Sequence, residues 1–76
     1  MNKDRRDRLG ELKSAIEEAK GDLDTIKEEE EEAFENLPES LQGTENAAHM
    51  EECAQYLGDA VEGLQTALDS IDLIVE

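Results

Sequence analysis

The spacing of the apolar residues in the first half of the chain constrains its fold more than any other feature. Eight of them recur in steps of three or four: Leu9, Leu12, Ile16, Ala19, Leu23, Ile26, Ala33 and Leu37. This heptad spacing is typical of an α-helix that packs against another helix along one narrow seam. Only Glu30 interrupts it, where another aliphatic residue is expected. The spacing predicts a long helix over about residues 4–36.

The residues after this helix predict a reversal of the chain. Pro38 lacks a backbone donor and disfavours helical conformation in the residue before it, so the helix should end there. Residues 37–44 then form the turn, which has room for a short helical segment that begins at Pro38. We expect Gly43 to supply a left-handed backbone conformation and Thr44 to cap the next helix.

The second helix, over about residues 45–74, has a broader apolar face than the first. Two columns at heptad spacing contain Ala47, Met50, Ala54, Leu57, Val61, Leu64, Leu68, Ile71 and Val75, and a third contains Cys53, Ala60, Ala67 and Ile74. Three apolar columns are more than one neighbouring helix covers. The fold class we predict is therefore all-α. It is an antiparallel two-helix hairpin, one domain over residues 1–76, which self-associates through the third column as a homodimeric four-helix bundle.

The charges are distributed very unevenly. All seven lysines and arginines lie in the first 27 residues, where seven carboxylates balance them. Residues 28–76 hold fifteen carboxylates and one possible cation, His49, so the net charge of −15 belongs to this part of the chain. Such a field repels nucleic acid and anionic membranes and attracts basic protein surfaces. We expect no direct binding to nucleic acid or membrane, and a basic protein as partner.

The cellular location follows from the cysteine content and from the hydrophobic segments. Cys53 is the only cysteine, so the chain cannot form an internal disulfide, which suits a reducing compartment. The N-terminus lacks the apolar run of a signal peptide, and no segment approaches the roughly 18 apolar residues of a membrane span. These features predict a soluble, cytoplasmic protein.

One segment of the chain resembles a known group of proteins. The residues EEEEEAFENLPESLQGTENAAHMEECAQYLGDAVEGLQTALDSIDLI (28–74) follow a charged helix that opens with NKDRRDRLGEL. This arrangement resembles small acidic helical proteins carried by phages and mobile elements of Gram-positive bacteria, in which an N-x-P-E-S-L turn (residues 36–41) joins two helices. The resemblance implies a bacterial or phage origin and a helical hairpin, and it assigns no catalytic residue.

The carboxylates do not form the pattern of an enzyme or of a defined metal site. The run of residues 28–32 winds around a helix, so its side chains diverge, whereas acid catalysis and metal binding need carboxylates that converge in a cavity. No EF-hand, Cys and His cluster, phosphate-binding glycine loop or nucleophile triad is present. We expect no catalytic residue, no cofactor and no specific metal ligand. Weak binding of calcium or magnesium stays open as a third possibility.

Our leading hypothesis is a non-enzymatic protein that occupies a basic, nucleic-acid-binding groove of another protein. Phage-encoded DNA mimics of the anti-restriction or anti-CRISPR type act in this manner. The expected contact residues are Glu28, Glu29, Glu30, Glu31, Glu32, Glu35, Glu39, Glu45, Glu51, Glu52, Tyr56 and Asp59. The alternative is a structural or assembly protein in which the third apolar column carries the function and acidity serves only solubility.

Overall fold

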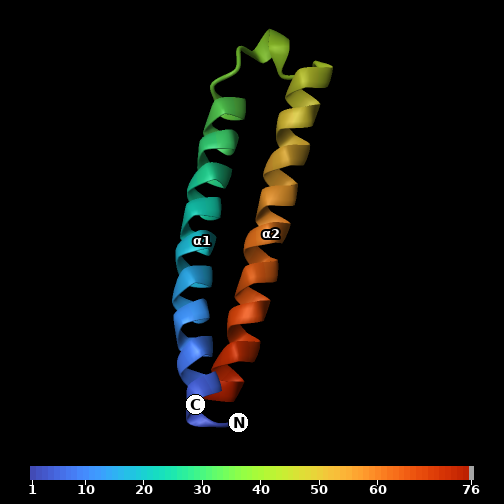
Figure 1. Cartoon of the computed structure of the whole chain (residues 1–76). Helices are drawn as coiled ribbons and strands as arrows, with labels where there is room; N and C mark the ends of the chain where they lie inside the picture. Colours follow the sequence, from blue (N-terminus) through green and yellow to red (C-terminus); the bar gives the residue numbers. More distant parts are fainter. Residues whose placement is uncertain (76) are drawn as a thin grey trace.

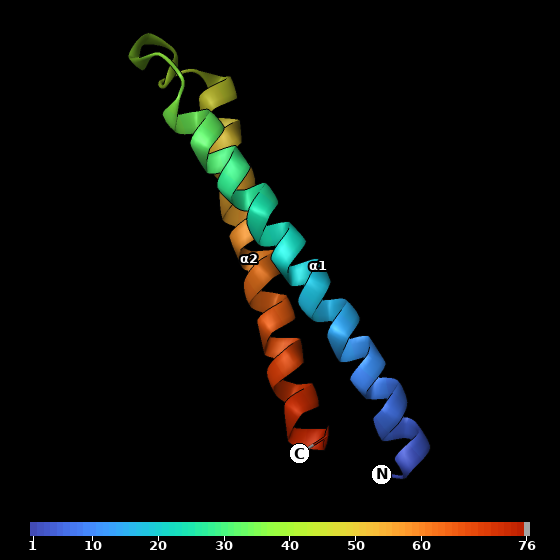
Figure 2. The same ribbon diagram turned by 90° about the vertical axis from the view of Figure 1, so that its left-hand side faces the viewer.

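The computed structural model describes residues 1–75 and contains two long helices joined by a turn (Figure 1). Helix α1 spans Lys3–Glu35, a short 3-10 helix η1 spans Glu39–Leu41, and helix α2 spans Glu45–Val75. The helices run antiparallel with both termini at one end (Figures 1 and 2), and the Cα trace measures 59 × 14 × 14 Å. The predicted all-α hairpin is confirmed. Glu76, the last of the counted carboxylates, lies outside the described residues.

Side chains flanking the two helices satisfy backbone groups that the helices leave free. At the start of α1 the backbone N–H of Arg5 donates to Oδ1 of Asn2 at 2.9 Å. At the start of α2 the backbone N–H of Ala47 donates to Oγ1 of Thr44 at 3.2 Å. An accepting side chain just before a helix typically contributes about 1 kcal/mol. The predicted Thr44 cap is therefore confirmed.

The short helical segment of the turn begins at Pro38, as predicted, but the turn does not use a left-handed glycine. The backbone N–H of Leu41 donates to the Pro38 carbonyl at 2.8 Å, which closes the short helical turn of η1. Gln42 Nε2 donates to the Leu37 carbonyl at 3.1 Å and ties the turn to the end of α1. Gly43 does not have a positive φ, so that prediction was wrong. The turn changes the chain direction through extended backbone at Pro38 and the 3-10 helix η1, and no described residue has a positive φ.

The face of α1 that packs on α2 differs from the predicted seam. The half-buried residues of this face, apart from glycine, are Leu9, Lys13, Ile16, Lys20, Leu23, Lys27, Glu30 and Phe34, and Leu37 just beyond the helix is half-buried as well. Leu9, Ile16, Leu23 and Leu37 were predicted there. The other predicted column, Leu12, Ala19, Ile26 and Ala33, is exposed. Helix α1 is thus rotated about its axis so that lysines occupy the place expected for these aliphatic residues.

Lysine side chains suit this position because their aliphatic stems can cover apolar surface while their ammonium groups stay in water. Lys13 and Lys20 line the same groove as Val61 and Leu68 of α2. Opposite Lys27, α2 has Gly58, where an added Cβ would lie 3.5 Å from Lys27 Cε. The absence of a side chain at residue 58 leaves room for the stem of Lys27 against α2.

The hairpin buries very little. In the described part of the chain only Ala47 and Leu68 are buried apolar residues. Each remaining apolar residue of the seam keeps part of its surface in water, because a helix has only one neighbour in a two-helix hairpin. Hydrophobic stabilisation scales with the apolar area removed from water, so a single hairpin gains little of it.

This small core makes one leucine decisive for stability. Leu68→Ala should lower the free energy of unfolding by about 2 kcal/mol or more, because Leu68 keeps only 5% of its surface exposed. Leu73→Ala is the matched control on the same helix, since Leu73 is 79% exposed and the substitution should change stability by under about 0.5 kcal/mol. Urea denaturation followed by circular dichroism measures both. Equal effects of the two substitutions would contradict the packing of α2.

Candidate functional site

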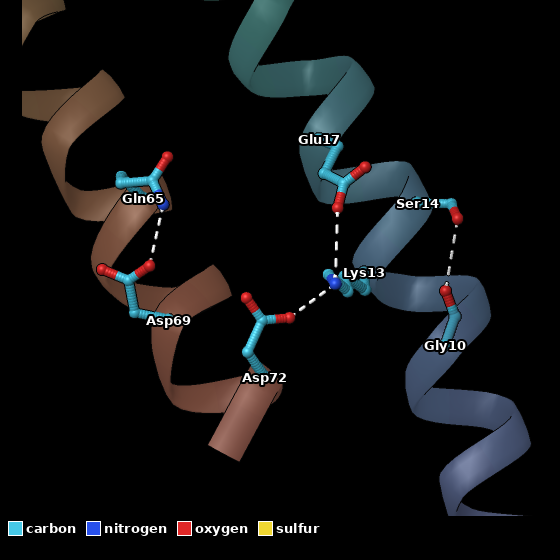
Figure 3. Close-up of polar contacts among 7 residues, drawn as sticks. All are labelled: Gly10, Lys13, Ser14, Glu17, Gln65, Asp69 and Asp72. Atoms are coloured by element: carbon cyan, nitrogen blue, oxygen red, sulfur yellow. Dashed lines mark hydrogen bonds and ion pairs between the residues drawn. The ribbon is translucent and has the colours of Figure 1, made fainter. Parts of the chain in front are cut away.

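One ion pair joins the two helices near the open end of the hairpin (Figure 3). Lys13 Nζ lies 2.5 Å from Oδ1 of Asp72 on α2 and 3.8 Å from Oε1 of Glu17 on its own helix. The hydrogen bond with Asp72 is the main cause that raises the pKa of Lys13, and Glu17 adds to the effect. The Lys13 side chain is only 30% exposed. The ion pair therefore helps to fix the axial register of the two helices.

Two cross-helix contacts define the register and divide the molecule into two halves. Lys13 pairs with Asp72, and the stem of Lys27 lies next to Gly58. Residues 28–58 therefore form the half of the hairpin nearest the turn, which we call the turn half. The remaining residues form the half that contains both termini.

The turn half carries most of the net charge. It contains ten carboxylates and no lysine or arginine, which gives −10 of the total −15. The other half contains twelve carboxylates and all seven basic residues. Folding thus brings the acidic end of α1 and the acidic start of α2 together at one end of the rod. The candidate site is this end.

A shallow depression of about 290 Å³ lies in the turn half between the two helices. Three carboxylates line it, Glu31 and Glu35 from α1 and Glu51 from α2. Phe34, Ala54 and Gln55 complete the lining. Lys27 Nζ lies 3.4 Å from Glu31 Oε1, so one of the three carboxylates already has a cation beside it. The depression joins an aromatic ring and carboxylates from both helices.

Sequence reasoning did not find Phe34, Ala54 or Gln55 as members of the candidate site. Phe34 lies at heptad spacing after Lys13, Lys20 and Lys27, but a column of three lysines does not look like a packing face in a sequence. Once α1 is rotated to put these lysines against α2, Phe34 faces α2 as well. The pattern was present, but recognising it required the rotation of the helix.

The predicted contact residues differ from one another in how exposed they are and in where they lie. The exposed carboxylates of the turn half are Glu28, Glu29, Glu31, Glu32, Glu35, Glu39, Glu45, Glu51 and Glu52. Glu30 is half-buried in the column that packs on α2 and does not line the depression. Tyr56 is 64% exposed, and its hydroxyl donates to Glu52 Oε1 at 3.3 Å. Asp59 is exposed but falls just outside the turn half.

The residues expected to mediate self-association are unevenly covered by the hairpin itself. Cys53 and Ala67 are half-buried, whereas Ala60 and Ile74 are exposed. Cys53 is a free thiol whose Sγ lies 3.6 Å from His49 Nε2, one turn earlier on α2.

The charges on α1 oppose the dipole of their own helix. A helix favours acids at its N-terminus and bases at its C-terminus, by about 0.3–1 kcal/mol each. Helix α1 has one acid in its first turn, Asp4, among Lys3, Arg5 and Arg6, and it has no base in its last turn. Like charges one turn apart, as in Glu28 with Glu32 and Glu31 with Glu35, cost a few tenths of a kcal/mol more per pair. The carboxylates of the turn half therefore lower the stability of α1.

Residues 1–75 contain neither a metal-binding cluster nor a membrane-spanning helix. No group of three or more His, Cys, Asp or Glu side chains in this range is arranged to hold a metal ion. Neither helix within it has the length and hydrophobicity required to cross a bilayer.

Comparison with known proteins assigned no family: no protein-family model, curated protein or solved structure matches the chain. The resemblance of residues 28–74 to proteins of phages and mobile elements therefore stays an expectation.

The raised pKa of Lys13 predicts a specific loss of stability in alkali. The ion pair contributes fully below the ordinary lysine pKa of 10.5, and its contribution is lost as the pH rises through the higher pKa of the folded state. Raising the pH above the pKa of Lys13 in the folded state should destabilise the wild type more than Asp72→Asn, which lacks the partner carboxylate. Asp69→Asn, at an exposed carboxylate that accepts from Gln65, is the matched control and should behave as the wild type.

Urea midpoints across the alkaline range measure this difference. An equal alkaline loss in the wild type and in Asp72→Asn would show that the pair between the helices contributes nothing to stability.

Relief of the unfavourable charges on α1 should raise stability. Glu35→Lys places a cation in the last turn of α1 and one turn after Glu31, so it should add about 0.5–1 kcal/mol to the free energy of unfolding. Glu62→Lys changes the net charge equally in the middle of α2, where Asp59 is the one charged neighbour a turn away and no helix end is near, so it should have a smaller effect. Thermal unfolding followed by circular dichroism measures both. Destabilisation by Glu35→Lys would mean that the acidic end of α1 is stabilising.

Proposed function

We propose that the protein is a non-enzymatic interaction protein whose turn half binds a basic, nucleic-acid-binding surface of another protein. The observation that carries the proposal is the placement of ten carboxylates without a lysine or arginine at one end of a folded hairpin. The field of such an array attracts basic surfaces and repels nucleic acid. In the phage or mobile-element setting that the sequence resembles, the partner is a host protein and the place of action is the bacterial cytoplasm.

The charge density of the turn half approaches that of a nucleic acid. The rod is 59 Å long, so ten net charges over about half of it give one per roughly 3 Å, compared with one per about 1.7 Å of axis in duplex DNA. The helices hold these charges in fixed positions, which lowers the entropy cost of binding relative to a disordered acidic tail. A groove shaped for a polyanion would meet a rigid rod of matching sign.

The cost of this arrangement to the protein supports a role for it. The acids at the end of α1 oppose the helix dipole and repel one another, so folding stability alone does not favour them there. A basic partner would neutralise these charges and offset the cost. Solubility alone would be served equally well by acids spread over both helices.

The depression between Glu31, Glu35 and Glu51 supports arginine as the contact of this partner. A guanidinium group can stack on an aromatic ring such as Phe34 and donate to carboxylates in a fork geometry. Arginine is also the residue that proteins use most in recognising phosphates. An arginine that normally contacts a nucleic-acid backbone would find both kinds of partner in this depression.

The test is capture of host proteins with the wild type and with two charge-reversed variants. Reversal of Glu28, Glu31, Glu32 and Glu35 to lysine should abolish capture of basic, nucleic-acid-binding proteins and leave the hairpin folded. Reversal of Glu11, Glu18, Glu62 and Asp69 to lysine is the matched control. It changes the net charge equally outside the turn half and should retain capture at low salt.

Binding of a purified captured protein should weaken steeply as salt rises, because screening shortens the range of the attraction. Nucleic acid should compete for the same surface of the partner. Capture of the same proteins by both reversed variants would contradict a specific role for the turn half.

A structural or assembly role is the second candidate, and one observation favours it. Exposed aliphatic residues such as Leu12, Ile26 and Ile74 remain on the hairpin. If assembly is the only function, then reversal of the turn-half glutamates should leave biological activity unchanged, whereas polar substitution of these residues should abolish it. If the turn half instead binds a basic partner, reversal of its glutamates should abolish biological activity.

A further inference from the structure

From Cys53 onwards, one side of helix α2 carries no carboxylate, although the chain is strongly acidic. In steps of three or four residues from Cys53 to Ile74, the positions on this side are cysteine, tyrosine, alanine, glycine, alanine, serine and isoleucine. The four carboxylates of this segment, Asp59, Glu62, Asp69 and Asp72, lie on its other sides. Acids that serve solubility would also be expected on a side that faces water, so we infer that this strip is covered in the functional state.

The exposed aliphatic column of α1 lies on the same side of the hairpin as this strip. The polar groove that contains Lys13, Lys20, Gln65 and Asp72 marks the opposite side of the seam. At 3.6 residues per turn, the column Leu12, Ala19, Ile26 and Ala33 falls across the seam from that groove, and so does the column Cys53, Ala60, Ala67 and Ile74. The two columns form one continuous apolar face, which we call the free face.

The free face contains large side chains that a monomer would leave in water. Leu12 is 57% exposed, Ile26 48% and Ile74 41%. Between them lie the small residues Ala60 and Ala67, which allow the backbone of another helix to approach closely. The large residues can anchor a contact, and the small residues let a neighbouring helix approach. The free face is therefore suited to packing against another pair of helices.

The accessible surface of the chain also exceeds that of a compact monomer. It is 5642 Å², whereas a folded monomer of 8.5 kDa is expected to expose about 4,700 Å². The difference is close to the roughly 800 Å² that each partner buries in a standard protein interface. Coverage of the free face by one more hairpin would remove an area of this size.

The charges select a second copy of this chain in one orientation. Residues 1–13 carry five basic and three acidic side chains, while the turn half carries −10. If two hairpins pack side by side with their turns together, the two turn halves lie beside each other. If one hairpin is reversed, each turn half lies beside the half of the other copy that holds all seven lysines and arginines and has a net charge of only −5. The reversed arrangement also places α1 antiparallel to α1 of the second copy, so that each α1 supplies charges that suit the dipole of the other.

We propose that the free face binds a second copy of the hairpin in reversed orientation and forms a four-helix bundle with an acidic turn at each end. The interface is isologous, so the same residues contribute from both copies. This proposal does not rest on the proposed function. If both hold, the dimer presents two acidic sites at opposite ends of a rod and can engage two basic surfaces.

Sedimentation equilibrium tests whether the dimer exists. The wild type should have twice the chain mass of 8.5 kDa at micromolar concentration. Ala60→Glu with Ala67→Glu places charges in the free face and should weaken self-association at least about 100-fold, because each buried, unpaired charge costs several kcal/mol. Gln55→Glu with Thr66→Glu adds the same charge on other sides of α2 and should remain dimeric. Circular dichroism establishes that each variant is helical.

The orientation has its own test, which uses a spin label in the turn. Ser40→Cys in a Cys53→Ala background provides one labelling site per chain on η1. The reversed arrangement predicts a distance between the two labels on the order of 50 Å, since the turns lie at opposite ends of a rod 59 Å long. Turns at the same end would give under about 25 Å, because bundle helices are spaced 8–10 Å apart.

Pulsed electron–electron double resonance measures this distance. A short distance would overturn the orientation. A wild-type monomer, or a free-face variant that dimerises as well as its control, would overturn the proposal itself.

Discussion

The structure depends on one narrow contact between two helices, and this contact is weak in apolar burial. Ala47 and Leu68 are the buried apolar residues of the described chain, and the rest of the seam is half exposed. Lysine stems on α1 cover part of the apolar surface of α2, and the pair of Lys13 with Asp72 aligns the helices. The same register determines which charges lie opposite one another. The position of the acidic turn half therefore follows from the seam.

The charge distribution runs against the stability of the isolated hairpin. Glutamates at the end of α1 repel one another and oppose the helix dipole, and arginines at its start oppose the dipole as well. Both mismatches have the same remedy, which is contact with charge of the opposite sign. Under the two proposals, a basic partner would supply it for the turn half, and a reversed second hairpin would supply it for both ends of α1. The two proposals therefore share one electrostatic cause and are compatible, because the free face and the depression lie on opposite sides of the seam.

For the candidate site, the sequence alone identified the acidic region but not its internal arrangement. The glutamates of residues 28–52 were recognised because charge can be counted along a chain. The depression between Glu31, Glu35 and Glu51 was not, since it depends on which face of α1 meets α2. Glu30 shows the same limit. The sequence marked it as an interruption of the seam, and only the structure places it in the packed column and outside the depression.

The sequence by itself determined the two helices, the break at Pro38 and the Thr44 cap, because helical periodicity, the missing donor of proline and side-chain capping act within a few residues. The rotation of α1 about its axis was decided only by tertiary structure. Two adjacent columns of α1 were available to α2, an aliphatic one and a lysine one, and both have heptad spacing. The space at Gly58 and the carboxylate of Asp72 on the facing helix favour the lysine column. Such a choice depends on residues more than 30 positions away, which local spacing does not report.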